Sequence, residues 1–404
     1  MAIASDVVIV SACRTPIGKI RGSLATLRPD DLLALVFKES MRRSQIPLSD
    51  VGEVFAGCAN QAGEDNRNVA RMSSLLAEFH QHIPAVTVNR LCASGLEAII
   101  QAARAISLGD YQVAVAGGVE SMSRAPLVLA KPASAFASGV PAIFDSSLGW
   151  RFPNPALEAL FPLESMGETG ENVAQEFGIS RAEQDNYALA SHQKAVKAQK
   201  SGFFKDEILE VSVPQSKGAA IVISQDDGPR ANTSLAQLSS LKPVFRQPGT
   251  VTAGNSSSMN DGAAALVLAS REYAHAHGLP VLGVLRSWAS VGVDPRFMGI
   301  GPVPATQKAL AKIKAQAKDL DLIELNEAFA SQSLAVIRQL GLAEDKVNRQ
   351  GGAIALGHPL GCSGARIVTT LLSGMKAHQA QLGLASLCVG VGQGLSLIVE
   401  RESD

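Results

Sequence analysis

Short apolar runs alternate with longer amphipathic stretches along the chain. Runs of small and β-branched apolar residues at 7–10 (VVIV), 113–117 (VAVAG), 265–269 (ALVLA) and 382–391 (LGLASLCVGV) predict buried strands. The stretch 96–109 (LEAIIQAARAISLG) predicts a helix, and glycines fall at the junctions between elements. This order indicates an α/β protein with buried sheets.

The second half of the chain repeats the order of the first. Three pairs of segments correspond in order and type: 7–18 with 281–292, 54–61 with 322–329, and 88–95 with 347–364. We expect two domains of one topology that pack face to face and bring their equivalent loops around one site. A chance likeness between ordinary α/β segments is the alternative.

A stretch of different character separates the two halves. It is rich in Ser, Pro and Gly at its start, and Ser180 with Glu183 forms a capping box before a predicted amphipathic helix at 180–199. Long insertions on α/β scaffolds commonly bind substrate. We expect three parts: an N-terminal half (1–121 plus 252–280), an inserted loop domain (122–251) and a C-terminal half (281–404).

Composition narrows the class of function. The 404 residues are 46% hydrophobic and 18% charged, with a formal net charge of -1, which is ordinary for a globular protein and gives no electrostatic reason to expect nucleic acid as a partner. We expect no signal peptide and no membrane span. The five cysteines are scattered without a CxxC pair, which argues against a disulfide framework or a metal site and favours a reducing, cytoplasmic location.

Cys92 is the first candidate for chemistry, because it lies directly before a predicted helix in NRLCASG (89–95). The positive end of the helix dipole and free backbone N–H groups are expected to lower its pKa and favour a nucleophilic thiolate. A buried structural cysteine is the alternative.

Three residues of the C-terminal half are further candidates. His358 lies in a glycine-rich loop before Pro359, where it is placed to act as the base for a cysteine nucleophile, or is simply solvated. Cys388 marks a transition from a strand to a glycine loop, which is expected to expose its side chain and to free backbone N–H groups for an oxyanion. No Lys-Ser/Thr pair follows that loop, so it is not a phosphate loop. Asn326 follows a strand-like run, where a catalytic role and a helix N-cap are both open.

Together these segments resemble the thiolase family. Five ordered motifs carry the resemblance over almost the whole chain: NRLCASG (89–95), TAGNSSSMNDGAAA (252–265), NEAFA (326–330), GHPLGCSGAR (357–366) and CVGVGQG (388–394). The resemblance implies a five-layered αβαβα fold of two repeated halves with an inserted loop domain, assembled as a homodimer or homotetramer.

The resemblance also implies roles for these residues. Cys92 takes the acyl group as a thioester, and His358 activates it and forms one oxyanion hole with a water held by Asn326. Cys388 is the acid and base for the α-carbon of the second substrate. The backbone N–H groups of Cys92 and Gly390 form the second oxyanion hole. Claisen chemistry needs such a base and such preorganised donors to act together.

Coenzyme A is implied as a co-substrate, with no permanently bound cofactor. The resemblance places Ser257 against its pantetheine arm, Met166 and Phe329 in the pocket wall, and Arg230 near its nucleotide end. It also places Ala253 in this binding site.

Parts of the sequence are similar to one subgroup, the 3-oxoadipyl-CoA thiolases of aromatic degradation. Val391 stands where a second glycine is usual and gives the CxGVGQG form of that subgroup, and the segments 58–72, 117–136, 144–155 and 301–306 also resemble it. The segments 164–180 and 279–293 are closer to general 3-ketoacyl-CoA thiolases of β-oxidation. Two further positions depart from commoner patterns: Ser258, where Gly is usual, and Ser165, where short-chain acetyl-CoA acetyltransferases carry His.

A dicarboxylic substrate would need a cation at the far end of the acyl pocket. We expect Arg151 or Arg124 to supply it, although a structural role is open for each. Rival functions are a decarboxylating ketosynthase, which Cys388 disfavours, and a redox sensor using Cys92 and Cys388. A non-catalytic lipid-binding protein of the same fold would have lost at least one of the four candidate catalytic residues.

Overall fold

The computed structural model describes residues 6–132, 134–136 and 138–402. Its main sheet has ten strands in two sets of one topology. The first set runs in the spatial order β1 (Val7–Arg14), β10 (Asn260–Ser270), β5 (Val113–Ser121), β3 (Val51–Gly57) and β4 (Ala85–Val88), with β2 (Gly18–Lys19) beside β10. The second set runs β11 (Gly283–Gly292), β14 (Gln393–Glu400), β13 (Leu382–Val389) and β12 (Leu322–Leu325).

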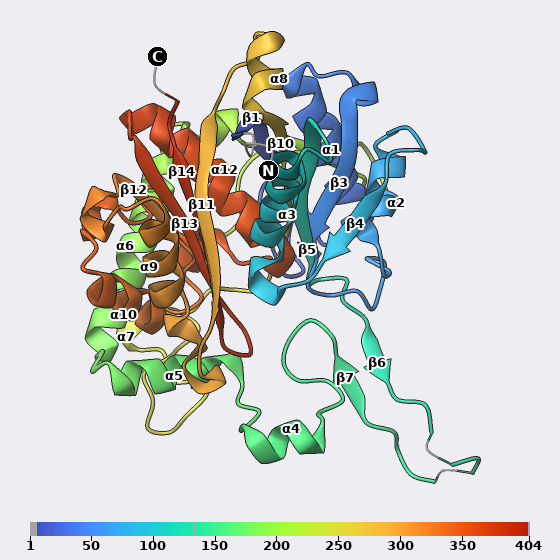
Figure 1. Cartoon of the computed structure of the whole chain (residues 1–404). Helices are drawn as coiled ribbons and strands as arrows, with labels where there is room; N and C mark the ends of the chain where they lie inside the picture. Colours follow the sequence, from blue (N-terminus) through green and yellow to red (C-terminus); the bar gives the residue numbers. More distant parts are fainter. Residues whose placement is uncertain (1–5, 133, 137, 403–404) are drawn as a thin grey trace.

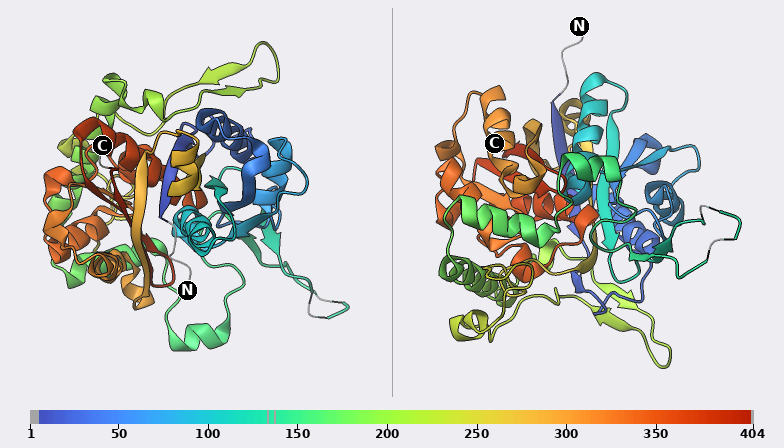
Figure 2. Two further views of the ribbon diagram at one scale, coloured as in Figure 1. Left: turned by 45° about the horizontal axis from the view of Figure 1, so that its top comes forward. Right: turned by 90° about the horizontal axis from the view of Figure 1, so that it is seen from below.

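The two sets share their strand directions. Each has two antiparallel pairings followed by a parallel one: β1 with β10, β10 with β5 and β5 with β3, and then β11 with β14, β14 with β13 and β13 with β12. A parallel bridge between Ile323 and Val347 takes the place that β4 has in the first set. The predicted internal repeat is confirmed. Figures 1 and 2 show the two sets on opposite sides of the molecule, the first in blue to teal except for the yellow β10 and the second in orange to red.

Helices complete a five-layered arrangement. Between the two sets lie α3 (Ser94–Leu108) and α12 (Leu360–His378), which share one core with the inner faces of both. The outer face of the first set packs on α1 (Pro29–Ser44), α2 (Val69–Leu76) and α8 (Arg271–Ala276), and that of the second on α9 (Pro302–Lys312) and α10 (Ala330–Leu340). The predicted αβαβα fold is confirmed.

Both faces of the central strands are buried, which explains why their sequences are almost continuously apolar. In β10, Leu266 and Leu268 face the central helices whereas Ala265 and Val267 face the outer ones. Each such leucine contributes roughly 1.5–3 kcal/mol through burial, so the sheet and the central helices form one cooperative core.

The two central helices touch backbone to backbone near their N-termini. A Cβ atom on Gly95 of α3 would lie 2.6 Å from the carbonyl oxygen of Gly361, and one on Gly364 of α12 would lie 2.1 Å from the nitrogen of Leu96. Only glycine permits this approach. The contact therefore brings the two helix starts, and the loops that precede them, side by side.

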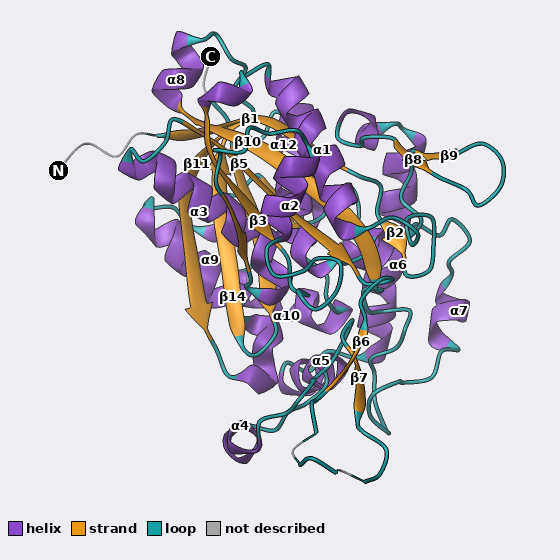
Figure 3. Cartoon of the chain, turned by 90° about the vertical axis from the view of Figure 1, so that its right-hand side faces the viewer, coloured by secondary structure: helices purple, strands orange, loops and turns teal. Residues whose placement is uncertain are grey.

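The region between β5 and β10 carries the loop elements. They are β6 (Leu127–Leu129), β7 (Ile143–Asp145), α4 (Pro155–Leu160), α5 (Met166–Glu176), α6 (Arg181–Lys200), β8 (Val211–Val213), β9 (Ile221–Ile223) and α7 (Leu235–Ser239). The capping box of Ser180 and Glu183 begins α6 as predicted. The β6–β7 and β8–β9 hairpins extend from the body (Figures 1 and 3). Near the tip of the first, Phe136 and Val140 are 97% and 94% exposed.

Shorter helices join the larger elements. They are η1 (Leu48–Asp50), η2 (Leu91–Ala93), η3 (Phe203–Asp206), η4 (Pro295–Ile300), η5 (Ala317–Asp319), η6 (Glu344–Lys346) and α11 (Ala353–Leu356). By length and composition one segment, Leu91–Leu108, is apolar enough to cross a membrane, but 61% of it is buried inside the protein as the central helix.

Candidate active site

Cys92 lies in η2, directly before α3, in a turn built by neighbouring side chains. Asn89 Oδ1 accepts a hydrogen bond from the N–H of Leu91 at 2.9 Å. Ser94 Oγ accepts from the N–H of Arg90 at 2.9 Å and donates to the Leu91 carbonyl oxygen at 2.7 Å. Leu91 has a φ of 47°, a conformation that costs energy for a residue other than glycine. These bonds hold Cys92 at the N-terminus of the central helix.

His358 has the same place in the second half, directly before the start of α12. Gly357 before it has a φ of 112°, and a Cβ there would lie 2.4 Å from the side-chain amide of Asn260. That same amide accepts, through its Oδ1, a hydrogen bond from the N–H of His358 at 3.0 Å. Glycine is therefore required for the loop to seat His358 in the interior, where it is only 5% exposed.

Ser363 fixes the tautomer of the His358 imidazole. The Ser363 hydroxyl donates to the Pro359 carbonyl oxygen at 2.9 Å, so it can only accept from Nδ1 of His358, 2.6 Å away. The proton therefore sits on Nδ1, and Nε2 is the free basic nitrogen. Nε2 faces the side-chain amide nitrogen of Asn326 at 3.4 Å.

Asn326 follows the last residue of β12, and its N–H donates to Ser386 of β13 at 2.9 Å. Its Oδ1 is buried and has no hydrogen-bond partner among the described residues. The alternative role of Asn326 as a helix N-cap is wrong, because α10 begins at Ala330 with Phe329 as its N-cap. A buried amide oxygen without a partner is costly for a structural residue and is available to a water or a substrate.

Cys388 lies near the end of β13 and packs against Val251, Met298 and Phe329. It is only 1% exposed, so the prediction that the strand end exposes its side chain is wrong. Burial raises the pKa of its thiol well above the ordinary value, and the neighbouring sulfur of Cys92 raises it further. The two cysteines are therefore electrostatic neighbours, one from each half.

The candidate nucleophile and base are both neutral in the folded protein. Burial raises the pKa of the Cys92 thiol to about 11, although the backbone N–H groups of Gly390 and of Cys92 itself act to lower it. Burial lowers the pKa of His358 to about 3, and the Arg366 guanidinium lowers it further. The predicted net lowering of the Cys92 pKa is wrong, because desolvation outweighs the N–H groups. Those two N–H groups nevertheless converge on the sulfur.

A cavity of about 300 Å³ opens at Cys92. Its wall is mostly apolar. The residues that line it come from η2, from β5 and the residues after it, from the segment between β7 and the start of α5, from the β13–β14 turn, from the loop after β3 and from the start of α12: Ala59, Asn60, Leu91, Cys92, Glu120, Met122, Ala125, Ser146, Ser147, Leu148, Gly149, Trp150, Arg151, Glu164, Ser165, Met166, Leu360, Gly390 and Val391. Val391 has a φ of 62°, which is strained for a β-branched residue. Of the residues predicted for the CoA site, Met166 lies in this cavity.

A second cavity, of about 370 Å³, is more polar. Arg230, Ala253, Ser258 and His192 line it, and burial lowers the pKa of His192 to about 4. Arg230 also lines a neighbouring cavity of about 490 Å³ together with two lysines of α6, Lys197 and Lys200. This part of the surface is suited to phosphate groups.

Two other predicted CoA contacts lie outside this second cavity. Ser257 has its hydroxyl bonded to the Ala328 carbonyl oxygen at 3.1 Å, while its neighbours Ser256 and Ser258 line the cavity. Phe329 is buried against Cys388 and Met166.

The two candidate arginines differ. Arg151 lines the cavity at Cys92. Arg124 does not, and its guanidinium forms two hydrogen bonds with the Glu64 carboxylate. The structure therefore brings only Arg151 to the first cavity.

Sequence reasoning missed Glu120, a buried carboxylate in β5 that lines the first cavity. It accepts hydrogen bonds from the N–H groups of Ala59 and Asn60 at 3.0 Å and of Gly361 at 2.7 Å. Burial raises its pKa to about 7. A single charge in an otherwise apolar strand, VAVAGGVES, was the available signal.

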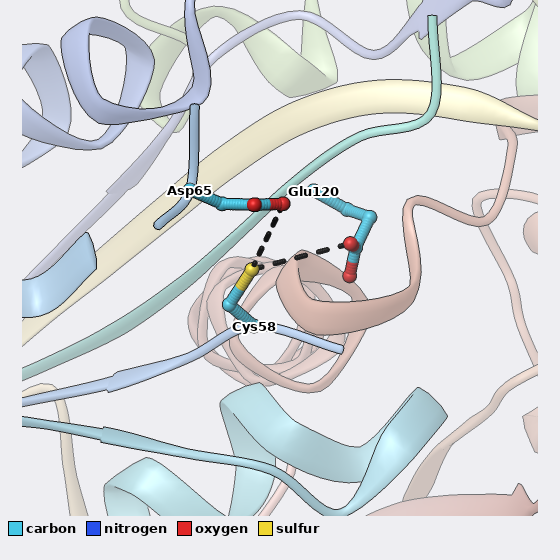
Figure 4. Close-up of side chains that lie close together, drawn as sticks. All are labelled: Cys58, Asp65 and Glu120. Carbon is cyan, nitrogen blue, oxygen red and sulfur yellow. Dashed lines mark hydrogen bonds between the residues drawn. The ribbon is translucent and has the colours of Figure 1, made fainter. Parts of the chain in front are cut away.

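Glu120 lies beside Cys58 and Asp65, with ligand atoms within 4.8 Å of one another (Figure 4). The Cys58 thiol donates to the Asn60 carbonyl oxygen. Because protein groups already occupy Glu120 and Cys58, the cluster acts as a hydrogen-bonded junction between β3, β5 and α12.

Comparisons with known proteins cover the whole chain. Family models described as "Thiolase, N-terminal domain" and "Thiolase, C-terminal domain" match residues 7–272 and 279–401. The chain is 52% identical over 402 residues to a beta-ketoadipyl-CoA thiolase of Pseudomonas aeruginosa, with 99% of this chain and 100% of that protein covered. It is 53% identical over 399 residues to a beta-ketoadipyl-CoA thiolase of Pseudomonas putida, at 98% and 99% coverage. The solved structure of the Bacillus anthracis acetyl-CoA acetyltransferase matches with a TM-score of 0.92 at 41% identity, at 99% and 100% coverage.

Proposed function

The chain belongs to the thiolase family, and from that premise we propose that it cleaves 3-oxoadipyl-CoA with coenzyme A to give succinyl-CoA and acetyl-CoA. Thiolases are acyltransferases that use CoA as a substrate. The observation that carries the proposal is the close contact of α3 with α12 near the helix starts that follow Cys92 and His358. Two further contacts support it: Nε2 of His358 lies 3.4 Å from the Asn326 amide nitrogen, and Cys92 and Cys388 are electrostatic neighbours. Identity of 52% and 53% to two beta-ketoadipyl-CoA thiolases supports 3-oxoadipyl-CoA as the substrate.

Cys92 is the nucleophile in this proposal. Its sulfur attacks the C3 ketone carbon, and its proton passes to Nε2 of His358 as the bond forms. Because the pKa of the thiol is raised to about 11 and that of the imidazole lowered to about 3, the proton moves with the attack rather than before it. The N–H groups of Cys92 and Gly390 receive the oxyanion that develops on the ketone oxygen.

The C2–C3 bond then breaks and releases the enolate of acetyl-CoA. His358 and a water held by the free Oδ1 of Asn326 stabilise the enolate oxygen. Cys388 gives its proton to the α-carbon, and its elevated pKa keeps that proton available at neutral pH. The succinyl group stays on Cys92 as a thioester. CoA thiol then attacks the thioester carbonyl, and Cys388 accepts the CoA proton. The bond between the carbonyl carbon and the Cys92 sulfur breaks, Nε2 of His358 returns its proton to that sulfur, and succinyl-CoA leaves.

In this proposal CoA binds against the loop elements between β5 and β10. Arg230, with Lys197 and Lys200 nearby, suits the phosphate groups, and Ala253 lines the same groove. The pantetheine arm would run past Ser257 toward Met166 and Phe329, which pack near Cys388.

We also propose that the protein is a homodimer or homotetramer in a reducing cytoplasm. The β6–β7 hairpin extends from the body with Leu127, Phe136 and Val140 at least 68% exposed, and exposed apolar residues gathered on one segment mark association surfaces. All five cysteines are free thiols, which suits a reducing compartment.

The test is a panel of 3-ketoacyl-CoA substrates with free CoA, followed by loss of the absorbance of the substrate enolate. We expect the highest kcat/KM for 3-oxoadipyl-CoA. A higher value for straight-chain 3-ketoacyl-CoA or for acetoacetyl-CoA would assign the enzyme to β-oxidation or to acetyl transfer instead. Cleavage of no member would point to a non-catalytic member of the fold.

A further inference from the structure

The cavity at Cys92 carries a positive side chain in its wall. Among the described residues that line it, Glu120, Arg151 and Glu164 are charged, and Arg151 alone is cationic. Leu148, Trp150 and Met166 make the wall around it largely apolar. Arg151 is half-buried in this wall, so an anion bound in the cavity would meet a partly desolvated cation.

Neutral groups hold Arg151 in place. Its NH1 donates to the Ser146 carbonyl oxygen at 3.0 Å and approaches Asn60 Oδ1 at 3.4 Å. Asn60 and Ser146 are themselves buried and bonded to each other at 3.1 Å, and the Asn60 N–H donates to Glu120. The guanidinium is therefore oriented without being neutralised.

Most of the donor capacity of Arg151 remains unused. Both of its hydrogen bonds use NH1, and its Nε and NH2 have no partner among the described residues. No described carboxylate forms an ion pair with it, and Asp65 acts on it only at longer range. The remaining edge of a guanidinium presents two parallel N–H groups, which match the two oxygens of a carboxylate.

The other arginines nearby are already neutralised. Arg124 pairs with Glu64, and Arg296 lies 3.7 Å from Glu164. Arg151 thus differs from these arginines in its position in the cavity and in having no carboxylate partner within the described part of the chain.

We infer that Arg151 binds the distal carboxylate of a dicarboxylic acyl group attached to Cys92, with Asn60 as the residue that positions it. The inference rests on the proposed function and names the element of the site that selects the substrate. A succinyl thioester places two methylene groups between its carbonyl and its carboxylate. The apolar wall receives the methylene groups, and Nε and NH2 of Arg151 receive the carboxylate.

The experiment compares two substrates of equal chain length. 3-Oxoadipyl-CoA ends in a carboxylate, and 3-oxohexanoyl-CoA ends in a methyl group. The ratio of their kcat/KM values is measured for the wild type, R151A, R151K, R151Q and the control R124A. We expect R151A and R151Q to lower the ratio about 100-fold, because the substrate carboxylate is left unpaired in an apolar cavity. R151K keeps the charge without the paired N–H groups and is expected to lower it about tenfold.

R124A is the matched control, because Arg124 belongs to the same loop segment but is bonded to Glu64 outside the cavity. We expect its ratio to match that of the wild type. A wild-type ratio near one would refute the dicarboxylic substrate while leaving thiolase activity intact. A wild-type preference that survives in R151A or R151Q overturns the role of Arg151 alone.

Binding supplies a second readout if a variant folds but turns over slowly. Succinyl-CoA and butyryl-CoA have the same chain length and differ in the distal carboxylate. Inhibition by succinyl-CoA should weaken about 100-fold in R151A relative to inhibition by butyryl-CoA. Equal weakening of both would assign Arg151 to general packing. If R151A does not fold, R151Q decides the question by the same ratio.

Discussion

The two halves of the molecule build equivalent positions and use them differently. Cys92 and His358 each lie two residues before a central helix, α3 at Ser94 and α12 at Leu360. One becomes the nucleophile of the proposed mechanism and the other its base. The repeat thus supplies a facing pair of helix starts, and the residue type at each decides the chemistry.

The parallel strand pairs, β3 with β5 and β12 with β13, give further equivalent positions in the two halves. Gly57 pairs with Gly118 in the first half as Leu325 pairs with Ser386 in the second. Counting onward from these pairs gives two further equivalences: Cys58 with Asn326, and Glu120 with Cys388.

The difference between the halves lies in hydrogen bonding. Glu120 accepts from three backbone N–H groups, and Cys58 donates to a carbonyl oxygen. In the second half Asn326 Oδ1 has no partner among the described residues, and Nε2 of His358 carries no proton and meets the Asn326 amide nitrogen only at 3.4 Å. Satisfied groups stabilise the junction, whereas groups with unused bonding capacity are available to a substrate.

The largest effects are expected at the two cysteines. Cys92→Ser should lower kcat about 10⁴-fold and abolish the covalent acyl-enzyme, because the serine hydroxyl is a far weaker nucleophile. Cys388→Ala should also lower kcat strongly, yet mass spectrometry should still find acyl on Cys92. Acyl retained in Cys92→Ser and absent from Cys388→Ala would exchange the two roles.

The equivalent pair Asn326 and Cys58 tests the comparison directly. Asn326→Ala should lower kcat about 100-fold or more, since one oxyanion site loses its water ligand. Cys58→Ala should leave kcat within about threefold and instead reduce stability by roughly 1 kcal/mol. Steady-state kinetics and urea unfolding of both variants separate these outcomes. A large fall in kcat for Cys58→Ala would contradict the division between the halves.

Glu120 should make stability depend on pH. Its pKa is raised from 4.5 to about 7, so the native state holds a proton in that range that the unfolded state has lost. The contribution of Glu120 to the free energy of unfolding is fully present below pH 4.5 and is lost as the pH rises through 7. The loss amounts to about 3 kcal/mol. Urea unfolding of wild type and Glu120→Gln from pH 4.5 to 8 measures it.

His358 acts with the opposite sign. Its pKa is lowered to about 3, so its contribution is present above pH 6.5 and is lost as pH falls. It is the same in wild type and in Glu120→Gln and cancels in their difference. A difference that does not change with pH would mean that Glu120 keeps its proton, or its charge, throughout.

The smallest effect is expected at the serines beside the two helix starts. Ser363→Ala removes the acceptor that fixes the His358 tautomer and should lower kcat about tenfold with little change in KM. Ser94→Ala removes only backbone bonds of the Cys92 turn and should cost less. Equal effects of the two on kcat would show that the tautomer does not limit the rate.

Much of the fold and of the candidate site could be predicted from the sequence. The repeat was visible because equivalent segments keep both residue type and order. Cys92, His358, Asn326 and Cys388 could be named because the motifs that contain them resemble those of the thiolase family. The charge state of the Cys92 thiol could not be predicted, since desolvation depends on what the folded chain packs around it. The sequence also could not show which of Arg124 and Arg151 has a carboxylate partner, because Glu64, which binds Arg124, lies 60 residues away along the chain.

The glycine contact between α3 and α12 has a consequence for how the substrate specificity of such an enzyme can change. Because Gly95 and Gly364 let the two backbones touch, the spacing of the helix starts is set by main-chain atoms, and no exchange of side chains can widen it without separating the helices. The cavity wall between β7 and α5, by contrast, belongs to irregular segments that tolerate substitution. Divergence toward new acyl groups, in nature or in the laboratory, is therefore expected to proceed through the wall while the reacting centre stays the same.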